Sequence, residues 1–508
     1  MSNIEGNGEG SHQQILRTTF IIGGASIINI LIGLVRMKLV AVILGPAGVG
    51  LVGLLNNVMT AGSNIAALGV SNSGTRQIAE ARGHGKHEAI GAARKGLFLL
   101  SVILAMAGAA AFLLSSNMIA KFILADETLA DQVRWLAIGV AVTVIAGSQR
   151  ALLTGFRRVG DIAKVTIISS LLSALVGTSA IYMFGDDGLL LLVLAAPITG
   201  LLTNSYFSAR LPRVGKSRNS FLQIKEQWAA LIRIGSAFMV AGLSVTLGQL
   251  AVRTMVQNEL GVDSLGHFQA AWSISMTYIG FVLTAMGTDY YPRLTSVIAD
   301  HEKSTRLVNE QAEVAILLAG PVLVAMISLA PWVIRVMYTE EFMAATSVLR
   351  WQILGDVLKI LSWPMGFIIL ACGKGKIFMI KEALVMGFFV LLVWVLLPRL
   401  GLEATGVAFF AMYLVNIPIL IYVSRMLIGF KWDSTVKKLA IQLVIVAIAI
   451  AMLSGYSDIN AAIVGGGSSI VLGYLSVLRL SQLADVGGPA GKLLRKIYSG
   501  KAGKSRNE

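Results

Sequence analysis

Two arginines lie inside long apolar runs of this 508-residue chain, where an isolated charge is strongly disfavoured. Arg36 belongs to the run that ends at Leu44, and Arg253 belongs to a later run that ends near Gly261. Ionisable groups within such runs mark a binding or transport pathway by default, because burying them without a purpose is costly. A guanidinium group binds phosphate oxygens in a bidentate manner. The residue type therefore favours recognition of a phosphorylated ligand in an apolar setting.

A glycine-containing phrase follows each arginine. LGPAGVGLVG covers residues 44–53, and LGVDSLGHFQ covers residues 260–269. If the first apolar helix continues to Leu44, Arg36 lies eight residues before its end, which is roughly 12 Å at the rise of an α-helix. Arg253 lies eight residues before Gly261, so the two arginines are expected at equivalent depths. The alternative is that both helices end early and that both side chains extend to the outer interface.

Four further basic residues are candidates for the same ligand. Lys38 follows Arg36 by two positions, whereas Arg76 and Arg293 close the second and eighth apolar runs. Arg150 lies inside the fourth run. We interpret Arg76, Arg293 and Arg150 as cytoplasmic-side contacts for an anionic headgroup, or else as anchors of helix ends on the side of the membrane where basic residues collect. Lys38 shares the position of Arg36 near the outer end of the first run.

An acidic and a basic residue share one face of the tenth apolar run. Asp356 and Lys359 are three residues apart, which places them on the same side of a helix. They indicate a site for a proton or coupling ion of unknown identity, or else a pair that neutralises itself. Asp289 is a weaker candidate for the same role. No metal centre or other cofactor is predicted, since HGKHE at residues 84–88 lacks the H-E-x-x-H order of a helical zinc site.

Composition identifies the environment of these residues. The chain is 56% hydrophobic and only 14% charged, against about 25% charged residues in soluble domains. With repeated apolar runs of roughly 20 residues, this composition predicts an all-α polytopic membrane protein of about fourteen transmembrane helices. The predicted spans are 15–43, 47–70, 97–115, 133–155, 163–184, 188–208, 230–257, 266–288, 312–337, 346–371, 378–397, 403–424, 437–455 and 460–478.

The distribution of basic residues predicts the orientation of the chain. Most of the 42 lysines and arginines lie in the N-terminal segment, in the loops after even-numbered spans or in the C-terminal tail. Because basic loops remain in the cytoplasm, both termini are expected there. The net charge of +15 then reflects topology, so no nucleic-acid partner is expected. No loop is long enough for a soluble catalytic domain, and we do not expect an enzyme.

The chain contains an internal repeat. VRWLAIGV at residues 133–140 matches LRWQILGD at residues 349–356. Trp135 pairs with Trp351 and Gly139 pairs with Gly355, and the number of residues between the two members is the same in both pairs. Each copy holds six predicted spans. In membrane transporters that are built from two such repeats, the substrate site lies between the repeats. The predicted parts are a cytoplasmic segment 1–14, an N-lobe 15–215, a C-lobe 216–430, two additional helices within 431–480 and a basic cytoplasmic tail 481–508.

The chain resembles a known family in four features. These are LGPAGVG after the first helix, GTRQIAEARG after span 2, Pro292–Arg293 after span 8, and a 6+6 repeat with two added helices. The resemblance, over about residues 15–430, is to the polysaccharide-exporter (Wzx-type) flippases of the multidrug/oligosaccharidyl-lipid/polysaccharide (MOP) superfamily. It implies a V-shaped pair of six-helix lobes around a cationic cavity in the bacterial inner membrane.

The resemblance also implies a cargo and partners. The expected cargo is an oligosaccharide on undecaprenyl pyrophosphate, moved to the periplasmic leaflet for O-antigen, common-antigen or exopolysaccharide synthesis. Cavity arginines of the family hold the pyrophosphate, a role that would fall to Arg36 and Arg253, with Lys38 and Arg76 behind them. Further expected partners are membrane lipids, a polysaccharide polymerase and a chain-length regulator.

Two other functions are weighed against this interpretation. A cation-coupled multidrug antiporter of the same superfamily would need acidic residues in its cavity, whereas the deep charges here are mainly basic. A membrane glycosyltransferase or polysaccharide polymerase would need acidic or metal-binding residues on a sizeable outer loop, and the longest predicted one covers only positions 116–132, between spans 3 and 4. The sodium site of peptidoglycan-precursor flippases needs an acidic residue in helix 7, and none precedes Glu259 here.

Overall fold

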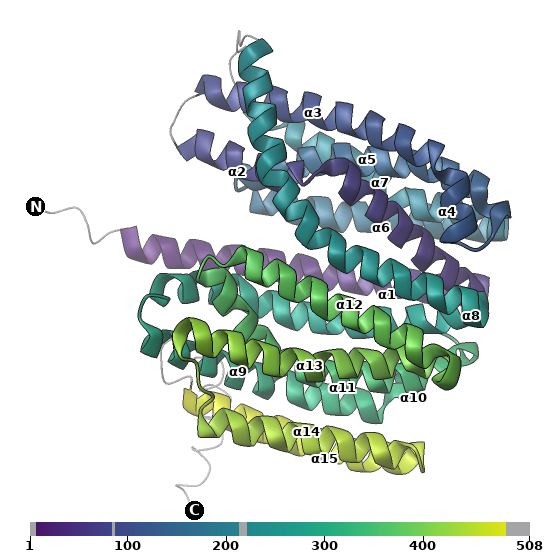
Figure 1. Cartoon of the computed structure of the whole chain (residues 1–508), viewed down its shortest axis with the longest axis vertical. Coiled ribbons are helices and arrows are strands. Elements are labelled where there is room, and N and C mark those ends of the chain that lie inside the picture. Colours follow the sequence, from purple (N-terminus) through teal and green to yellow (C-terminus); the bar gives the residue numbers. More distant parts are fainter. Residues whose placement is uncertain (1–6, 84–86, 213–220, 484–508) are drawn as a thin grey trace, which may run out of the picture. The chain divides into compact units, whose positions relative to one another are not determined.

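The computed structural model describes residues 7–83, 87–212 and 221–483, and every regular element in these ranges is a helix (Figure 1). This result confirms the all-α prediction. The helices are α1 (Asn7–Ala67), α2 (Val70–Gly83), α3 (His87–Leu114), α4 (Ser116–Phe122), η1 (Glu127–Leu129), α5 (Ala130–Gly155), α6 (Val159–Phe184), η2 (Gly185–Gly188), α7 (Leu189–Ala209), α8 (Phe221–Val297), α9 (His301–Ser328), α10 (Ala330–Met337), η3 (Glu340–Ala344), α11 (Ala345–Ala371), α12 (Gly375–Leu400), α13 (Glu403–Ile428), α14 (Ser434–Ser454) and α15 (Asp458–Leu483).

The predicted apolar spans all overlap helices of the structure. Two helices each contain two spans, because α1 and α8 continue through the glycine phrases. Among the described residues, ten helical stretches are long and apolar enough to cross a membrane by length and composition. The chain is thus a multi-pass helical membrane protein, and fourteen crossings stay a prediction.

The two glycine phrases contain the kinks of these long helices. Gly45 has φ 61° and ψ −164°, and Gly261 has φ 84° and ψ 174°. Both conformations lie at positive φ, which glycine adopts without the steric penalty of a side chain. The separation between the two kinks equals that between Trp135 and Trp351, so the helices break at corresponding points of the repeat. The first helical segment therefore continues past Arg36 to Leu44. The alternative, a helix that ends early near Arg36, does not hold.

The bounds of other helices repeat along the chain. α3 and α9 have 28 residues each, and α6 and α12 have 26 residues each. The starts of α6 and α12, at Val159 and Gly375, have the same separation as the two kinks, and the starts of α3 and α9 have nearly the same one. Helices of equal length thus recur in the second half of the chain, at the separation that the sequence repeat predicts. This recurrence supports a duplicated six-helix unit.

Residue packing divides the chain into two compact units. Unit 1 comprises Met1–Ala270, Arg335–Ala344 and Lys381–Leu402, and unit 2 comprises Ala271–Ile334, Ala345–Ile380 and Glu403–Glu508. Residues 221–270 therefore pack with the N-terminal helices, although the repeat assigns them to the second copy. The predicted lobes 15–215 and 216–430 and the segments that flank them stay predictions.

Candidate functional site

The two glycine phrases contact each other within unit 1. A Cβ atom on Gly50 would lie 2.6 Å from the Gly266 nitrogen and 2.8 Å from the Val262 carbonyl oxygen. A Cβ atom on Gly266 would lie 1.9 Å from the Pro46 carbonyl oxygen. Gly266 and Val262 are the repeat equivalents of Gly50 and Pro46, so the contact is self-complementary, as across a two-fold axis. We call residues 46–50 and 262–266 together the glycine crossing.

Arg253 lies beside the glycine crossing and is almost fully buried, with 4% of its surface exposed. Its Nε donates to Gln269 Oε1 at 3.1 Å, and its Nη1 donates to the Gln249 carbonyl oxygen at 3.1 Å. The guanidinium also lies 5.6 Å from the centre of the Phe268 ring. Gln269 itself packs against Gly53, its repeat equivalent, where a Cβ atom would come within 2.5 Å of the amide. Close backbone packing thus positions the amide that orients Arg253.

Sequence reasoning missed Gln269 as a functional candidate. The phrase that contains it, LGVDSLGHFQ, stands out by its glycines, and these indicate no role for Gln269. A usable signal was present, because a polar residue stands at the repeat equivalent of Gly53 in an apolar run. Such a pair of small and large residues is expected where two helices cross closely.

Arg36 is half-buried against another helix of unit 1. Its Nη2 donates to the Leu192 carbonyl oxygen of α7 at 3.2 Å. The offset between the two kink glycines aligns Arg36 with Val252 rather than with Arg253. One residue rotates a side chain by about 100° around an α-helix. The two arginines therefore lie at nearly equal distances from their kinks, but on different helix faces.

Lys38 holds the end of a neighbouring helix. Its Nζ donates to the Arg335 carbonyl oxygen at 3.1 Å and also to the Tyr338 carbonyl oxygen, at the C-terminal end of α10. Lysine side chains near helix C-termini satisfy carbonyls that have no partner inside the helix. Gln257 of α8, which is not the repeat equivalent of Lys38, donates to the Leu124 carbonyl oxygen, just after α4. The structure therefore gives the Lys38 ammonium a structural role at the end of α10, and a contact of Lys38 with ligand stays a prediction.

The remaining basic candidates are exposed. Arg76 pairs with Glu80 on α2 at 2.7 Å, and Arg150 lies on α5, also in unit 1. Arg293 lies on the part of α8 that belongs to unit 2. Of the six predicted basic residues, the structure buries Arg253 and half-buries Arg36 and Lys38.

A buried polar cluster surrounds Asp356 in unit 2. Asp356 has no exposed surface, and its Oδ2 accepts a hydrogen bond from Ser275 Oγ at 2.6 Å. Its other oxygen, Oδ1, has no hydrogen-bond partner, nor do the two polar side-chain atoms of fully buried Gln352, one turn earlier on α11. Buried polar groups are nearly always satisfied, so the carboxylate oxygen and the amide, one turn apart on α11, retain hydrogen-bonding capacity that a proton or an ion could use.

Lys359 faces sulfur and aromatic rings next to this cluster. Its Nζ lies 3.6 Å from Met276 Sδ, 5.9 Å from the Phe409 ring centre and 5.8 Å from the Tyr413 ring centre. An ammonium group is attracted to aromatic rings at such distances. The side chain of Asp289, the third acidic or basic candidate, lies outside the described residues. In the part of the chain that is described, no group of three His, Cys, Asp or Glu side chains could hold a metal ion.

Comparisons with known proteins bear on the family of the chain. Residues 15–298, more than half of the sequence, match the profile of the family described as "Polysaccharide biosynthesis protein". The "Lipid III flippase" of Escherichia coli (strain K12) is 22% identical over 405 residues, covering 77% of this chain and 93% of that protein. The "Lipid III flippase" of Shigella flexneri gives the same values.

Solved structures share the fold. One described as "Lipid II flippase MurJ, inward closed conformation" has a TM-score of 0.69 at 12% identity, covering 91% of this chain and 99% of that one. An inward-facing multidrug resistance MATE family transporter of the MOP superfamily has a TM-score of 0.68 at 18% identity, covering 83% and 99%. The fold is therefore that of MOP superfamily transporters, as the resemblance in sequence implied.

Proposed function

Because the chain belongs to the polysaccharide biosynthesis protein family, we propose that it is a flippase for an oligosaccharide linked to undecaprenyl pyrophosphate. It moves this lipid from the cytoplasmic to the periplasmic leaflet of a bacterial inner membrane, for O-antigen, common-antigen or exopolysaccharide synthesis. The observation that carries the proposal is Arg253, a guanidinium buried in an apolar helix beside a self-complementary glycine contact. The names of the curated relatives support the same class of cargo.

The chemistry of the cargo explains why arginine is needed. A pyrophosphate cannot enter hydrocarbon bare, because an unpaired charge there is severely penalised. Arginine stays charged when buried and presents a planar fork of N–H donors to phosphate oxygens. Arg36 and Arg253 would bind the pyrophosphate in turn, with Arg76, Arg150 and Arg293 receiving it at the cytoplasmic face. Both termini are placed in the cytoplasm by this proposal, as the basic loops predict.

Movement of one repeat against the other would expose the site alternately to the two leaflets. The glycine crossing bears on this part of the proposal, because it joins a segment of the first copy to a segment of the second. Its close backbone contact at Gly50 and Gly266 would have to open if these two segments moved apart.

Asp356 is the proposed coupling site. Its unpaired Oδ1 would take up a proton or a small cation during each cycle, and Lys359 would hold the opposite charge nearby. The buried Asp356 also favours a second candidate function, because a cation-coupled multidrug antiporter needs an acidic residue of this kind. The MATE structures, which share the fold, are multidrug resistance transporters. The basic character of the other deep charges favours the anionic cargo.

A flipping assay tests the proposed function. The purified protein in liposomes would be given a fluorescent undecaprenyl-pyrophosphate oligosaccharide, and the fraction reaching the opposite leaflet would be measured by chemical quenching. We expect flipping well above that of empty liposomes, and export of surface polysaccharide to fail in a deletion strain. Normal surface glycans in that strain, combined with increased drug sensitivity, would instead identify the antiporter.

A further inference from the structure

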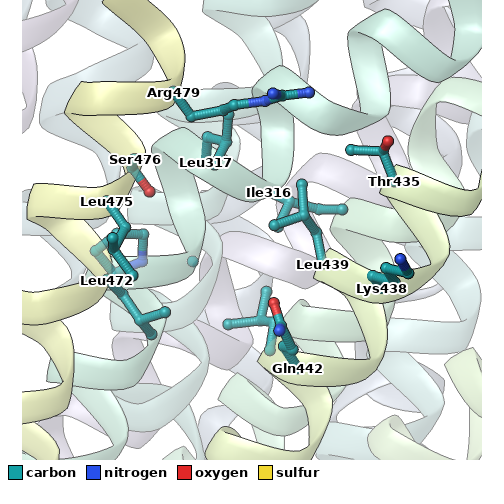
Figure 2. A pocket seen from close by; sticks show the side chains of 13 residues that line it. Ile316, Leu317, Thr435, Lys438, Leu439, Gln442, Leu472, Leu475, Ser476 and Arg479 are labelled. Carbon is teal, nitrogen blue, oxygen red and sulfur yellow. The ribbon is translucent and has the colours of Figure 1, made fainter.

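A pocket of about 390 Å³ lies in unit 2 between α9, α14 and α15 (Figure 2). Both C-terminal helices pack on α9 and on each other. The floor of the pocket is apolar and includes Ile316, Leu317 and Leu443, whereas Leu472 and Leu475 form one wall. A volume of this size falls in the range of small-ligand sites.

One end of the pocket is cationic. Arg479 reaches from α15 across this end toward the side where Thr435 and Lys438 of α14 lie (Figure 2). Arg479 Nε is held by Glu313 Oε1 of α9 at 2.9 Å, and Glu313 is itself buried. This contact uses one edge of the guanidinium and fixes its orientation over the pocket.

The first turn of α14 lies at the same end. The residue before the helix, Asp433, makes no side-chain hydrogen bond to cap it. Uncapped N–H groups at a helix N-terminus attract phosphate, and Thr435 and Lys438 stand in this turn and the next. Two cationic side chains, a hydroxyl and a helix N-terminus thus line this end of the pocket, with Lys438 at its exposed edge.

The positions of the basic and apolar lining residues along α14 and α15 match the polar and hydrocarbon layers of a bilayer leaflet. α14 and residues 458–481 of α15 are apolar enough to span a membrane. Lys438 lies four residues, about 6 Å, from the start of α14, and Leu472 lies seven residues, about 10 Å, deeper than Arg479. The cationic end is therefore level with lipid headgroups, and the apolar part of the pocket extends into the hydrocarbon region.

We propose that this pocket binds one anionic glycerophospholipid, with its phosphate between Lys438 and Arg479 and an acyl chain along Leu472, Leu475 and Leu443. Charge complementarity selects the anionic headgroup, and the apolar lining selects the chain. The bound lipid fills the space between the C-terminal helices and α9. The bound lipid would thus stabilise the packing of α14 and α15 on α9 within unit 2, independently of the cargo.

Native mass spectrometry of the full-length protein in detergent tests this proposal. The probes are phosphatidylglycerol, phosphatidylcholine, undecaprenyl phosphate and inorganic phosphate, each titrated separately. We expect phosphatidylglycerol to bind at least fivefold more tightly than phosphatidylcholine, and Lys438→Ala to weaken it about fivefold, the contribution of one basic residue near a membrane surface. The exposed neighbour Lys437 does not line the pocket, so Lys437→Ala should change binding less than twofold.

A second pair of variants tests the apolar part. Leu475→Trp would fill the pocket from a half-exposed position and should displace the lipid, whereas Ile470→Trp, at an exposed position of α15 outside the pocket, should not. Equal binding of phosphatidylglycerol and phosphatidylcholine would overturn the proposal. It would also fall if Lys437→Ala weakened binding as much as Lys438→Ala, or if undecaprenyl phosphate or inorganic phosphate were preferred.

Discussion

Gly50 and Gly266, which hold the same position in the two copies of the repeat, pack backbone to backbone. A Cβ atom on either would come within 2.6 Å or less of the backbone of the opposite phrase. The kinks at Gly45 and Gly261 precede this contact by five residues in each copy. The glycine phrases therefore end one helical segment and also bring the next segments together.

Gly266→Ala should weaken this contact. The new methyl group would meet the Pro46 carbonyl oxygen at 1.9 Å, so the two segments must separate. We expect a loss of about 1–3 kcal/mol in stability, the usual cost of overpacking, measured by thermal unfolding in detergent, and slower flipping in liposomes. Gly242→Ala on the same helix is the control, because its Cβ atom would meet open space. Wild-type stability and flipping in Gly266→Ala would show that the close contact is dispensable.

Replacing the deep arginines should stop export without removing the protein from the membrane. Arg253→Lys keeps the charge but cannot donate to Gln269 and to the Gln249 carbonyl through a fixed fork, so we expect at least a tenfold loss of flipping. Arg36→Ala combined with Arg253→Ala should abolish flipping. Arg134→Ala removes an exposed arginine of unit 1 that pairs with Asp131, and serves as the control. Full export by the double variant would reject both residues as pyrophosphate ligands.

Asp356→Asn should uncouple transport from an imposed ion gradient. Asparagine keeps an acceptor for Ser275 Oγ and nearly the same volume, but it removes the charge. Flipping would be measured with and without a proton or sodium gradient, and we expect the gradient to lose its effect. Ser275→Ala removes the hydrogen bond and keeps the carboxylate, so it should retain coupling. A gradient response of wild-type size in Asp356→Asn would exclude Asp356 as the coupling site.

Lys38→Ala should lower stability more than it lowers cargo binding. The lost hydrogen bonds to the carbonyls at the end of α10 are worth about 1 kcal/mol, which would appear as a lower unfolding temperature. Cargo affinity should stay within about twofold of wild type. The control is Lys121→Ala, since its exposed pair with Glu127 is of a kind that contributes little. A large loss of affinity with unchanged stability would return Lys38 to the cargo site.

Acidic pH should loosen the start of α9. Asp300 Oδ1 accepts a hydrogen bond from the Lys303 amide at 3.1 Å, and this bond lowers the pKa of Asp300 below its ordinary value of 3.8. Because the folded pKa is depressed, the stabilisation is present above the ordinary pKa and is lost as pH falls through the lower folded pKa. Hydrogen exchange at the first turn of α9 should accelerate there, and Asp300→Asn should remove this pH dependence. Identical profiles in both proteins would contradict the cap.

Much of the fold was predictable because its signals are local. Apolar runs of membrane length predict the helices, and the two glycine phrases with the matched tryptophans predict the repeat, whereas they leave the end of the first helix in each copy open between two alternatives. The candidate site was less predictable. Arg36 and Arg253 were chosen for their depth, but their orientation depends on register, and a shift of one residue turns a side chain about 100° around the helix.

By itself, the sequence determined that the chain crosses a membrane as helices, that a glycine phrase recurs in each copy, and which charges lie within apolar segments. Only the tertiary structure decided that the first helix of each copy breaks at Gly45 and Gly261, and what those charges contact. It placed the Gln269 amide against Arg253 and the carbonyls at the end of α10 against Lys38, and it left one oxygen of Asp356 without a hydrogen bond. It also packed α9, α14 and α15 around a pocket with a cationic end. The reason is that periodicity and glycine act within a few residues, whereas such contacts depend on which helix faces meet across hundreds of residues.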